Sequence, residues 1–120
     1  MSKVLIVEDE PDVAALMARR LGAYHEVCFA ADGISAIASA RRERPDVIVL
    51  DIGLPAGDGL TVIERLRKLH DTARTPVVVV TASPLPSRRA QALEAGAAAF
   101  LTKPFQASVL VGAVATALAS

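Results

Sequence analysis

Short runs of apolar residues recur five times along the sequence, at residues 4–7, 27–29, 47–50, 77–80 and 99–101. Most of these runs are continuously apolar and lack the alternation of apolar and polar residues that a half-exposed strand shows. Continuous runs of this kind are typical of parallel strands that are covered by other elements on both faces. The sequence therefore predicts five buried parallel strands.

Amphipathic stretches separate and follow these runs. Pro11 suits the first turn of a helix that stops at Gly22, and Gly96 suits the C-terminal cap of a later helix. The expected helices cover residues 11–21, 32 or 33 to 42, 59–69, 87–94 and 106–118. The core-facing residues expected in the first helix are Val13, Leu16, Met17 and Leu21. Five repeats of a strand followed by a helix predict an α/β fold with a doubly wound, five-stranded parallel sheet and right-handed crossovers.

The composition limits both the core and the partners. With 120 residues the chain fits one domain, which we expect to span residues 1–120. Aromatic residues make up 3% of the sequence, so the core must be built from Val, Leu, Ile and Ala. Thirteen basic residues balance thirteen acidic ones, so the net charge gives no attraction to nucleic acid or to an anionic membrane.

The first residues and the single cysteine favour a reducing, cytoplasmic location. The apolar run after Lys3 meets an acid at Glu8, which makes it too short for a signal peptide or a membrane span. One cysteine, Cys28, cannot form an internal disulfide. It lies between Val27 and Phe29, so we expect a buried structural thiol.

Polar residues follow four of the five predicted strands. Glu8 and Asp9 follow the first strand, Asp51 the third and Thr81 the fourth, and the fifth leads to Lys103. In open α/β sheets, ligands bind beyond the carboxyl ends of the strands. We therefore expect these side chains to converge on one crevice.

Clustered carboxylates raise each other's pKa values unless a cation neutralises them. A site made of oxygen ligands with room for water suits Mg²⁺, or another divalent cation such as Mn²⁺, and Mg²⁺ commonly bridges protein and phosphate. A carboxylate can also act as a nucleophile and form an aspartyl-phosphate. Lys103 and Thr81 could then contact the remaining phosphoryl oxygens.

Four segments stand in order, each at the end of a predicted strand, and read VLIVEDEP, PDVIVLDIGLPAGDGL, TPVVVVTAS and GAAAFLTKPF. Asp51 and Thr81 are thirty residues apart, and a further twenty-two lead to Lys103. In these segments and spacings the chain resembles the receiver domain of bacterial two-component response regulators. The resemblance spans the whole chain and implies the flavodoxin-like (βα)5 receiver fold.

The resemblance implies a role for each acidic residue. Asp51 resembles the phosphoacceptor, and Asp9 resembles the direct metal ligand. Glu8 resembles the second acid, which often acts through water, and stands where Asp is commoner in the family. Gly53 would offer its backbone carbonyl to the metal and provides no side chain near the phosphoryl group.

The resemblance also implies the parts of a switch. Thr81 resembles the switch hydroxyl, Phe100 the switch aromatic residue and Lys103 the phosphate-binding lysine. Phe100 lacks the hydroxyl of the frequent tyrosine, so packing alone would favour an inward ring. Pro104 matches a proline whose preceding peptide is usually cis in the family.

The implied function is a phosphorylation-dependent signalling switch. A sensor histidine kinase or a phosphotransfer protein would donate the phosphoryl group. The domain would carry out only its own phosphoryl transfer and autodephosphorylation, without being a conventional enzyme. A downstream protein or effector domain would dock on the face formed by the fourth helix, fifth strand and fifth helix, and a homodimer is left open. Neither nucleic acid nor membrane is expected to bind this domain.

The last helix is unusual because residues 106–120 include no charged side chain. The helical period places Leu110, Val114, Ala117 and Leu118 toward the core. It turns Val111 and Ala115 outward, next to Gly112 and Thr116, beside Phe100. We expect this uncharged face to be a docking surface, and a dimer held by charges on this face is not expected.

Three other functions share parts of the pattern. A flavodoxin-like mononucleotide binder would need a phosphate cradle after the first strand. The loop there is acidic, loses one amide at Pro11, and contains no glycine-rich motif. A receiver-fold interaction module that is not phosphorylated remains a further alternative. A metal-dependent phosphohydrolase would need a cap or substrate domain for which the chain has no room.

Overall fold

The computed structural model describes residues 1–53, 59–82 and 86–119, in which strands and helices alternate strictly. The strands are β1 (Lys3–Val7), β2 (Glu26–Ala30), β3 (Val47–Asp51), β4 (Val77–Thr81) and β5 (Ala99–Thr102). The helices are α1 (Pro11–Leu21), α2 (Gly33–Glu43), α3 (Gly59–Lys68), α4 (Pro86–Ala95) and α5 (Ala107–Ala119). Each end lies within one residue of its expected position.

The five strands form one parallel sheet in the order β2-β1-β3-β4-β5. The chain builds outward from β1 to β2, and then crosses to β3 on the other side of β1. The strand order therefore reverses between β1 and β3, and such a reversal opens a crevice at the carboxyl ends of the two strands. This arrangement confirms the doubly wound α/β receiver fold.

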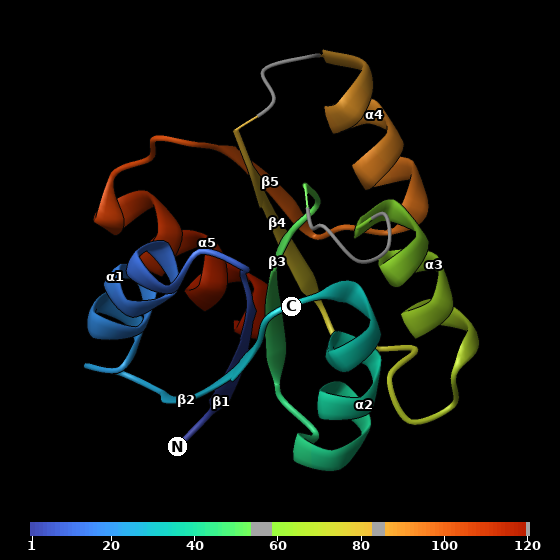
Figure 1. Cartoon of the computed structure of the whole chain (residues 1–120), viewed down its shortest axis with the longest axis horizontal. Coiled ribbons are helices and arrows are strands. Elements are labelled where there is room, and N and C mark those ends of the chain that lie inside the picture. The colour runs from blue at the N-terminus through green and yellow to red at the C-terminus, as the bar shows by residue number, and fades with distance from the viewer. Residues whose placement is uncertain (54–58, 83–85, 120) are drawn as a thin grey trace.

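Helices cover both faces of the sheet, with α1 and α5 on one face and α2, α3 and α4 on the other (Figure 1). Successive strand residues point to opposite faces. In β1, Val4 and Ile6 pack with α1 and α5, whereas Leu5 and Val7 pack with α2 and α3. All four are fully buried, and each large apolar side chain contributes roughly 1.5–3 kcal/mol. This two-sided burial explains the continuously apolar runs in the sequence.

Local signals fix the ends of two helices. The Asp32 side chain accepts a hydrogen bond from the Ser35 amide at 2.7 Å, and the Ser35 hydroxyl accepts one from the Asp32 amide at 3.4 Å. This capping box makes Gly33 the first residue of α2. Gly96, which follows α4, has a φ of 113°, in the left-handed region that favours glycine. It confirms the predicted cap.

Two apolar side chains are less buried than expected. Leu16 is 58% exposed, and the buried face of α1 is formed by Ala14, Met17 and Leu21 instead. Cys28 is half-buried, because β2 is an edge strand, and its thiol lies 3.7 Å from the Val4 carbonyl oxygen. In the three described segments, no helix is both long and apolar enough to cross a membrane.

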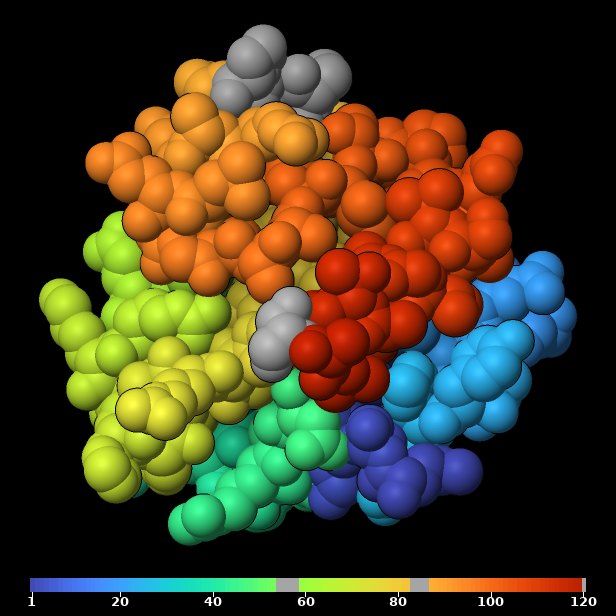
Figure 2. All heavy atoms as spheres, turned by 180° about the vertical axis from the view of Figure 1, so that it is seen from behind, coloured from blue at the N-terminus to red at the C-terminus, as the bar shows by residue number. Residues whose placement is uncertain are grey.

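Seen from behind, α4 in orange and α5 in red form one continuous surface (Figure 2). We call it the α4–β5–α5 surface and define it by Leu93, Phe100, Val109 and Thr116. Leu93 is 42% exposed and Val109 is 46% exposed, whereas Phe100 is half-buried against the core beneath α3 and α4. The surface therefore combines exposed aliphatic side chains with a partly accessible aromatic ring.

The outward position predicted for Val111 is wrong. Val111 is half-buried and lines a groove with Arg20 and Tyr24 on the side of α1. Val109 precedes it by two residues, or about 200° around the helix, and therefore faces away from α1. Leu110, Val114 and Ala117 are buried and Ala115 is exposed, as predicted. The prediction failed at Val111 because no charged residue in α5 marks where its exposed side begins.

Candidate functional site

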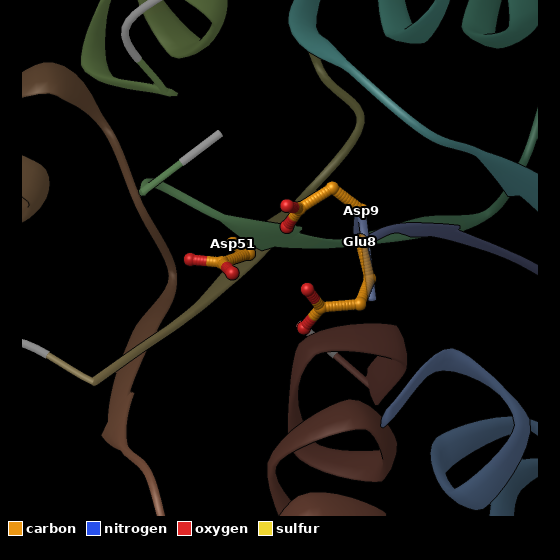
Figure 3. Close-up of side chains that lie close together, drawn as sticks. All are labelled: Glu8, Asp9 and Asp51. Carbon is orange, nitrogen blue, oxygen red and sulfur yellow. The ribbon is translucent and has the colours of Figure 1, made fainter. Parts of the chain in front are cut away.

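Three carboxylates gather where β1 and β3 end. Asp51 is the last residue of β3, and Glu8 and Asp9 directly follow β1, the parallel neighbour of β3. Each residue offers one oxygen, and these oxygens all lie within 4.8 Å of one another. Figure 3 shows the three side chains converging on one space from the two strand ends. The predicted crevice is therefore present.

Lys103 joins this cluster from the chain that follows β5. Its Nζ donates to Oε1 of Glu8 at 2.5 Å and to Oδ2 of Asp51 at 3.1 Å. The Lys103 amide donates to the Thr81 carbonyl oxygen at 2.7 Å, which fixes the backbone beside β4. The Lys103–Pro104 peptide is cis, in agreement with the resemblance.

The Asp51 carboxylate is held on both oxygens. Oδ1 accepts a hydrogen bond from the Gly53 amide at 2.9 Å, and Oδ2 accepts the one from Lys103. Asp51 is 7% exposed and Glu8 is 4% exposed, whereas Asp9 is exposed. A Cβ on Gly53 would lie 3.4 Å from Oδ1 of Asp51, in ordinary contact, so glycine leaves open space beside the carboxylate.

Burial and charge act against each other at the Glu8–Lys103 pair. Burial raises the pKa of Glu8 and the charge of Asp51 raises it further, although the hydrogen bond from Lys103 opposes both effects. Burial lowers the pKa of Lys103, but its hydrogen bonds to Glu8 and Asp51 outweigh this effect and hold the pKa above its ordinary value. Lys103 is therefore a firmly protonated cation that screens two carboxylates.

The residue set fits a divalent cation. Three ionised carboxylates against one ammonium leave a formal excess of two negative charges (3 − 1 = 2). The carboxylate oxygens are hard ligands of the kind that Mg²⁺ and Mn²⁺ prefer. Glu8 is the least available of the three, because Oε1 accepts from Lys103 and Oε2 accepts from the Glu10 amide at 3.3 Å. Asp9 and Asp51 are thus the better placed ligands.

The two predicted switch residues lie on the strands next to Asp51. Thr81 ends β4 and is 3% exposed, one position beyond Val80, which pairs with Asp51. Phe100 lies on β5 opposite Val79 and packs against the core on the side of α3 and α4. The structure thus brings Glu8, Asp9, Asp51, Thr81 and Lys103 to one edge of the sheet and places Phe100 further along it.

The direct contact between Glu8 and Lys103 is not among the predictions from the sequence. The resemblance implies that Glu8 acts on the metal through water and that Lys103 binds the phosphoryl group, and neither role implies a contact between the two side chains. The two residues are 95 positions apart, and no local pattern reports a contact at that separation. Their common position beyond strand ends was the one available indication.

Comparison with known proteins identifies relatives over nearly the whole chain. Residues 4–115 match the family model of the response regulator receiver domain. The response regulator PleD of Caulobacter vibrioides is 41% identical over 114 residues, which cover 94% of this chain and 25% of PleD. The transcriptional regulatory protein PrrA of Mycobacterium tuberculosis is 43% identical over 114 residues, which cover 93% of this chain and 48% of PrrA. The chain thus spans a quarter to a half of these relatives.

Solved structures match the fold closely. A putative response regulator from Chloroflexus aurantiacus superposes with a TM-score of 0.94 and 36% sequence identity, covering 99% of this chain and 98% of the other. The Mn²⁺-bound form of the response regulator Rcp1 superposes with a TM-score of 0.83 and 28% identity, covering 93% of this chain and 91% of the other.

Proposed function

This chain belongs to the response regulator receiver family of two-component signalling, a family of signalling domains rather than conventional enzymes, and we propose that its phosphoacceptor is Asp51. The position and contacts of the Asp51 carboxylate support this proposal. It is nearly buried at a strand end, oriented by the Gly53 amide and Lys103, and shares its crevice with Glu8 and Asp9.

The reaction needs an oxygen of Asp51 to attack phosphorus. A phosphohistidine would supply the phosphoryl group, so that the P–N bond breaks as the new O–P bond forms. Lys103 already lies on Oδ2 of Asp51 and can stabilise negative charge on the transferred group without a long movement. The product is an aspartyl-phosphate, which makes this chain a phosphoprotein of a phosphorelay.

A divalent cation would be held by Asp9, Asp51 and the backbone carbonyl of Gly53, with Glu8 acting through water. We assign Mg²⁺ to this role, with Mn²⁺ as a substitute that the Mn²⁺-bound Rcp1 structure supports. When bound, the cation supplies the charge neutralisation that lets an anionic phosphoryl group approach three carboxylates.

Thr81 and Phe100 would change position when Asp51 is phosphorylated. The Thr81 hydroxyl would move toward the phosphoryl group, and the Phe100 ring would move into the space that it leaves. Phosphorylation shifts this equilibrium only by the difference in contacts between the two states. Burial of the half-exposed ring is the main gain, because phenylalanine has no hydroxyl to bond.

The phosphoryl donor would be a sensor histidine kinase or a phosphotransfer protein. A groove of about 560 Å³ supports this, since its lining includes Leu16 and Met17 of α1 together with Lys103 and Phe105. The groove is largely apolar and reaches the lysine that touches Asp51, so an apolar helix of the donor could dock there and present its histidine.

The signal would leave through the α4–β5–α5 surface, to a downstream protein, an effector domain or a second copy of the chain. We propose that residues 1–120 form one receiver domain that acts in the cytoplasm and binds neither nucleic acid nor membrane itself. The balanced charge of the sequence supports the absence of binding to nucleic acid and membrane.

Beryllofluoride, which mimics a phosphoryl group, tests the site without a donor protein. With Mg²⁺ present, the NMR signals of Asp51 and Gly53 should shift in the wild type and stay unchanged in Asp51→Asn. Asp12→Asn, an exposed change on α1, should respond like the wild type. An unaltered response in Asp51→Asn would refute the assignment.

A further inference from the structure

The outer side of α1 carries a short stripe in which an apolar residue lies between two opposite charges. Asp12, Leu16 and Arg19 recur at spacings of four and three residues, so they lie on one side of the helix. All three are exposed, and Leu16 is 58% exposed although it is a large apolar residue. The other side of α1 packs on the sheet next to α5 (Figure 1). The stripe therefore faces away from the core of the domain.

The two charges of this stripe are unpaired within the domain. In the residues that the structure describes, neither Asp12 nor Arg19 forms an ion pair. The neighbouring helix α5 contains no charged residue, so it offers Arg19 no acid. Asp12 lies in the first turn of α1 and Arg19 in the last, about 10 Å apart along the helix, so they cannot pair with each other. Both charges are available to another molecule.

The stripe is complementary to its own reverse. When two copies of α1 lie antiparallel across a two-fold axis, the acidic start of each helix meets the basic end of the other. Pairing Asp12 of each copy with Arg19 of the other puts the axis midway between these residues, at Ala15 and Leu16. The exposed Leu16 side chains of the two copies then meet at the centre. The charges and the apolar residue thus indicate the same axis.

This agreement favours a second copy of the chain over a partner of unrelated sequence. An exposed leucine alone would not indicate a contact, because single apolar side chains are common on protein surfaces. Here Leu16 lies where the two charges, taken by themselves, place the centre of a symmetric contact. A parallel pair of helices would instead set Asp12 against Asp12 and Arg19 against Arg19, and like charges repel. The orientation of the two copies is therefore antiparallel.

We propose that the chain forms an antiparallel homodimer through α1, with Leu16 at the two-fold axis and an Asp12–Arg19 ion pair on each side of it. A contact of one helix from each copy is smaller than the roughly 1,200 Å² of a stable complex, so the dimer is weak. Leu16 also lines the groove that we propose for the phosphoryl donor, so donor and second copy exclude each other. That competition rests on the proposed function. The dimer does not, because it needs no modification of Asp51.

Sedimentation equilibrium of the unmodified chain, up to millimolar concentration, tests this dimer. The wild type should dimerise, and added salt should weaken the dimer by screening its charges. Arg19→Asp leaves only acids at these two positions and Asp12→Arg leaves only bases, so each variant alone should lose about tenfold or more in dimer affinity. An equimolar mixture of the two variants should dimerise about as strongly as the wild type, because every Asp then faces an Arg. Arg65→Asp, an exposed change on α3, should behave like the wild type.

Two results would overturn the α1 dimer. One is a wild type that stays monomeric up to millimolar concentration, which would leave the stripe to another partner such as the phosphoryl donor. The other is a mixture that dimerises no more than its two components, which would place any wild-type dimer on another surface. If a charge variant does not fold, Leu16→Glu decides the question, because a charge at the axis should abolish the dimer and an unchanged dimer would refute it. None of these results bears on Asp51, because the chain is unmodified throughout.

Discussion

At the scale of single residues, Lys103 holds two carboxylates that would otherwise repel each other. Its Nζ lies between Glu8 and Asp51, and its side chain is 17% exposed. A buried ion pair is expensive to form, but removal of one partner leaves an uncompensated charge that costs more. Lys103 therefore supports the fold before any phosphoryl group arrives.

The variant Lys103→Met should make stability depend more strongly on pH. Without the ammonium, burial and the charge of the neighbouring carboxylate raise the pKa of Glu8 further, so the folded state binds protons more tightly than the unfolded state. Stability is then highest below the ordinary carboxyl pKa of about 4 and falls as the pH rises through the raised values. Urea unfolding in a metal chelator should show a loss of roughly 2 kcal/mol near neutral pH and less in acid.

Lys68→Met, at an exposed position of α3, is the matched control and should change stability little at either pH. If Lys103→Met lost the same free energy in acid and near neutrality, Lys103 would not be screening these carboxylates.

Mg²⁺ affinity should depend more on Asp9 than on Glu8. Asp9→Ala removes the ligand that we propose binds the cation directly and should weaken binding more than tenfold, at about 1.4 kcal/mol per tenfold. Glu8→Gln should weaken it less, because both Glu8 oxygens already accept hydrogen bonds from Lys103 and Glu10. Calorimetric titration measures both, with Glu10→Gln as an exposed control. Equal affinity in the wild type and Asp9→Ala would exclude Asp9 as a ligand.

Among the helices and strands, α5 is the element whose exposed side is hardest to predict, because it contains no charged residue. In most elements the sequence pattern predicts which side is buried. The strands are apolar throughout, and in α3 the buried residues Val62, Ile63 and Leu66 alternate with charged residues that face the solvent. In α5 the apolar pattern correctly predicts the buried residues Leu110, Val114 and Ala117. No charged residue marks where the exposed side begins, so the half-buried position of Val111 follows from packing on the side of α1. The structure, not the sequence, assigns Val109 to the α4–β5–α5 surface and Val111 to the side of α1.

Substitution of Val111 and of Val109 by glutamate should therefore lower the free energy of unfolding by different amounts. Val111→Glu places a charge in a half-buried position and should lower the free energy of unfolding by about 1–3 kcal/mol. Val109→Glu should stay within about 0.5 kcal/mol, because the side chain is 46% exposed. Urea unfolding decides between them, and equal losses would mean that α5 is not rotated as described.

At the scale of the whole molecule, the order of strands creates the site. Reversal of the strand order between β1 and β3 places Asp9 beside Asp51, although each arrives from a different strand-helix unit. Strand composition, helix punctuation and the polar residues after strands were enough to predict the elements and the crevice. Contacts between distant segments, such as Glu8 with Lys103 or Arg67 with Gly96, depend on side-chain reach across the fold and left no local pattern.

The intact mass of the chain tests directly whether Asp51 accepts a phosphoryl group. Incubation with a small phosphodonor and Mg²⁺ should add the mass of one phosphoryl group to the wild type. Asp51→Asn, which keeps the shape of the side chain but removes its nucleophilic carboxylate, should gain none. Equal incorporation in Asp51→Asn and the wild type would show that Asp51 is not the phosphoacceptor.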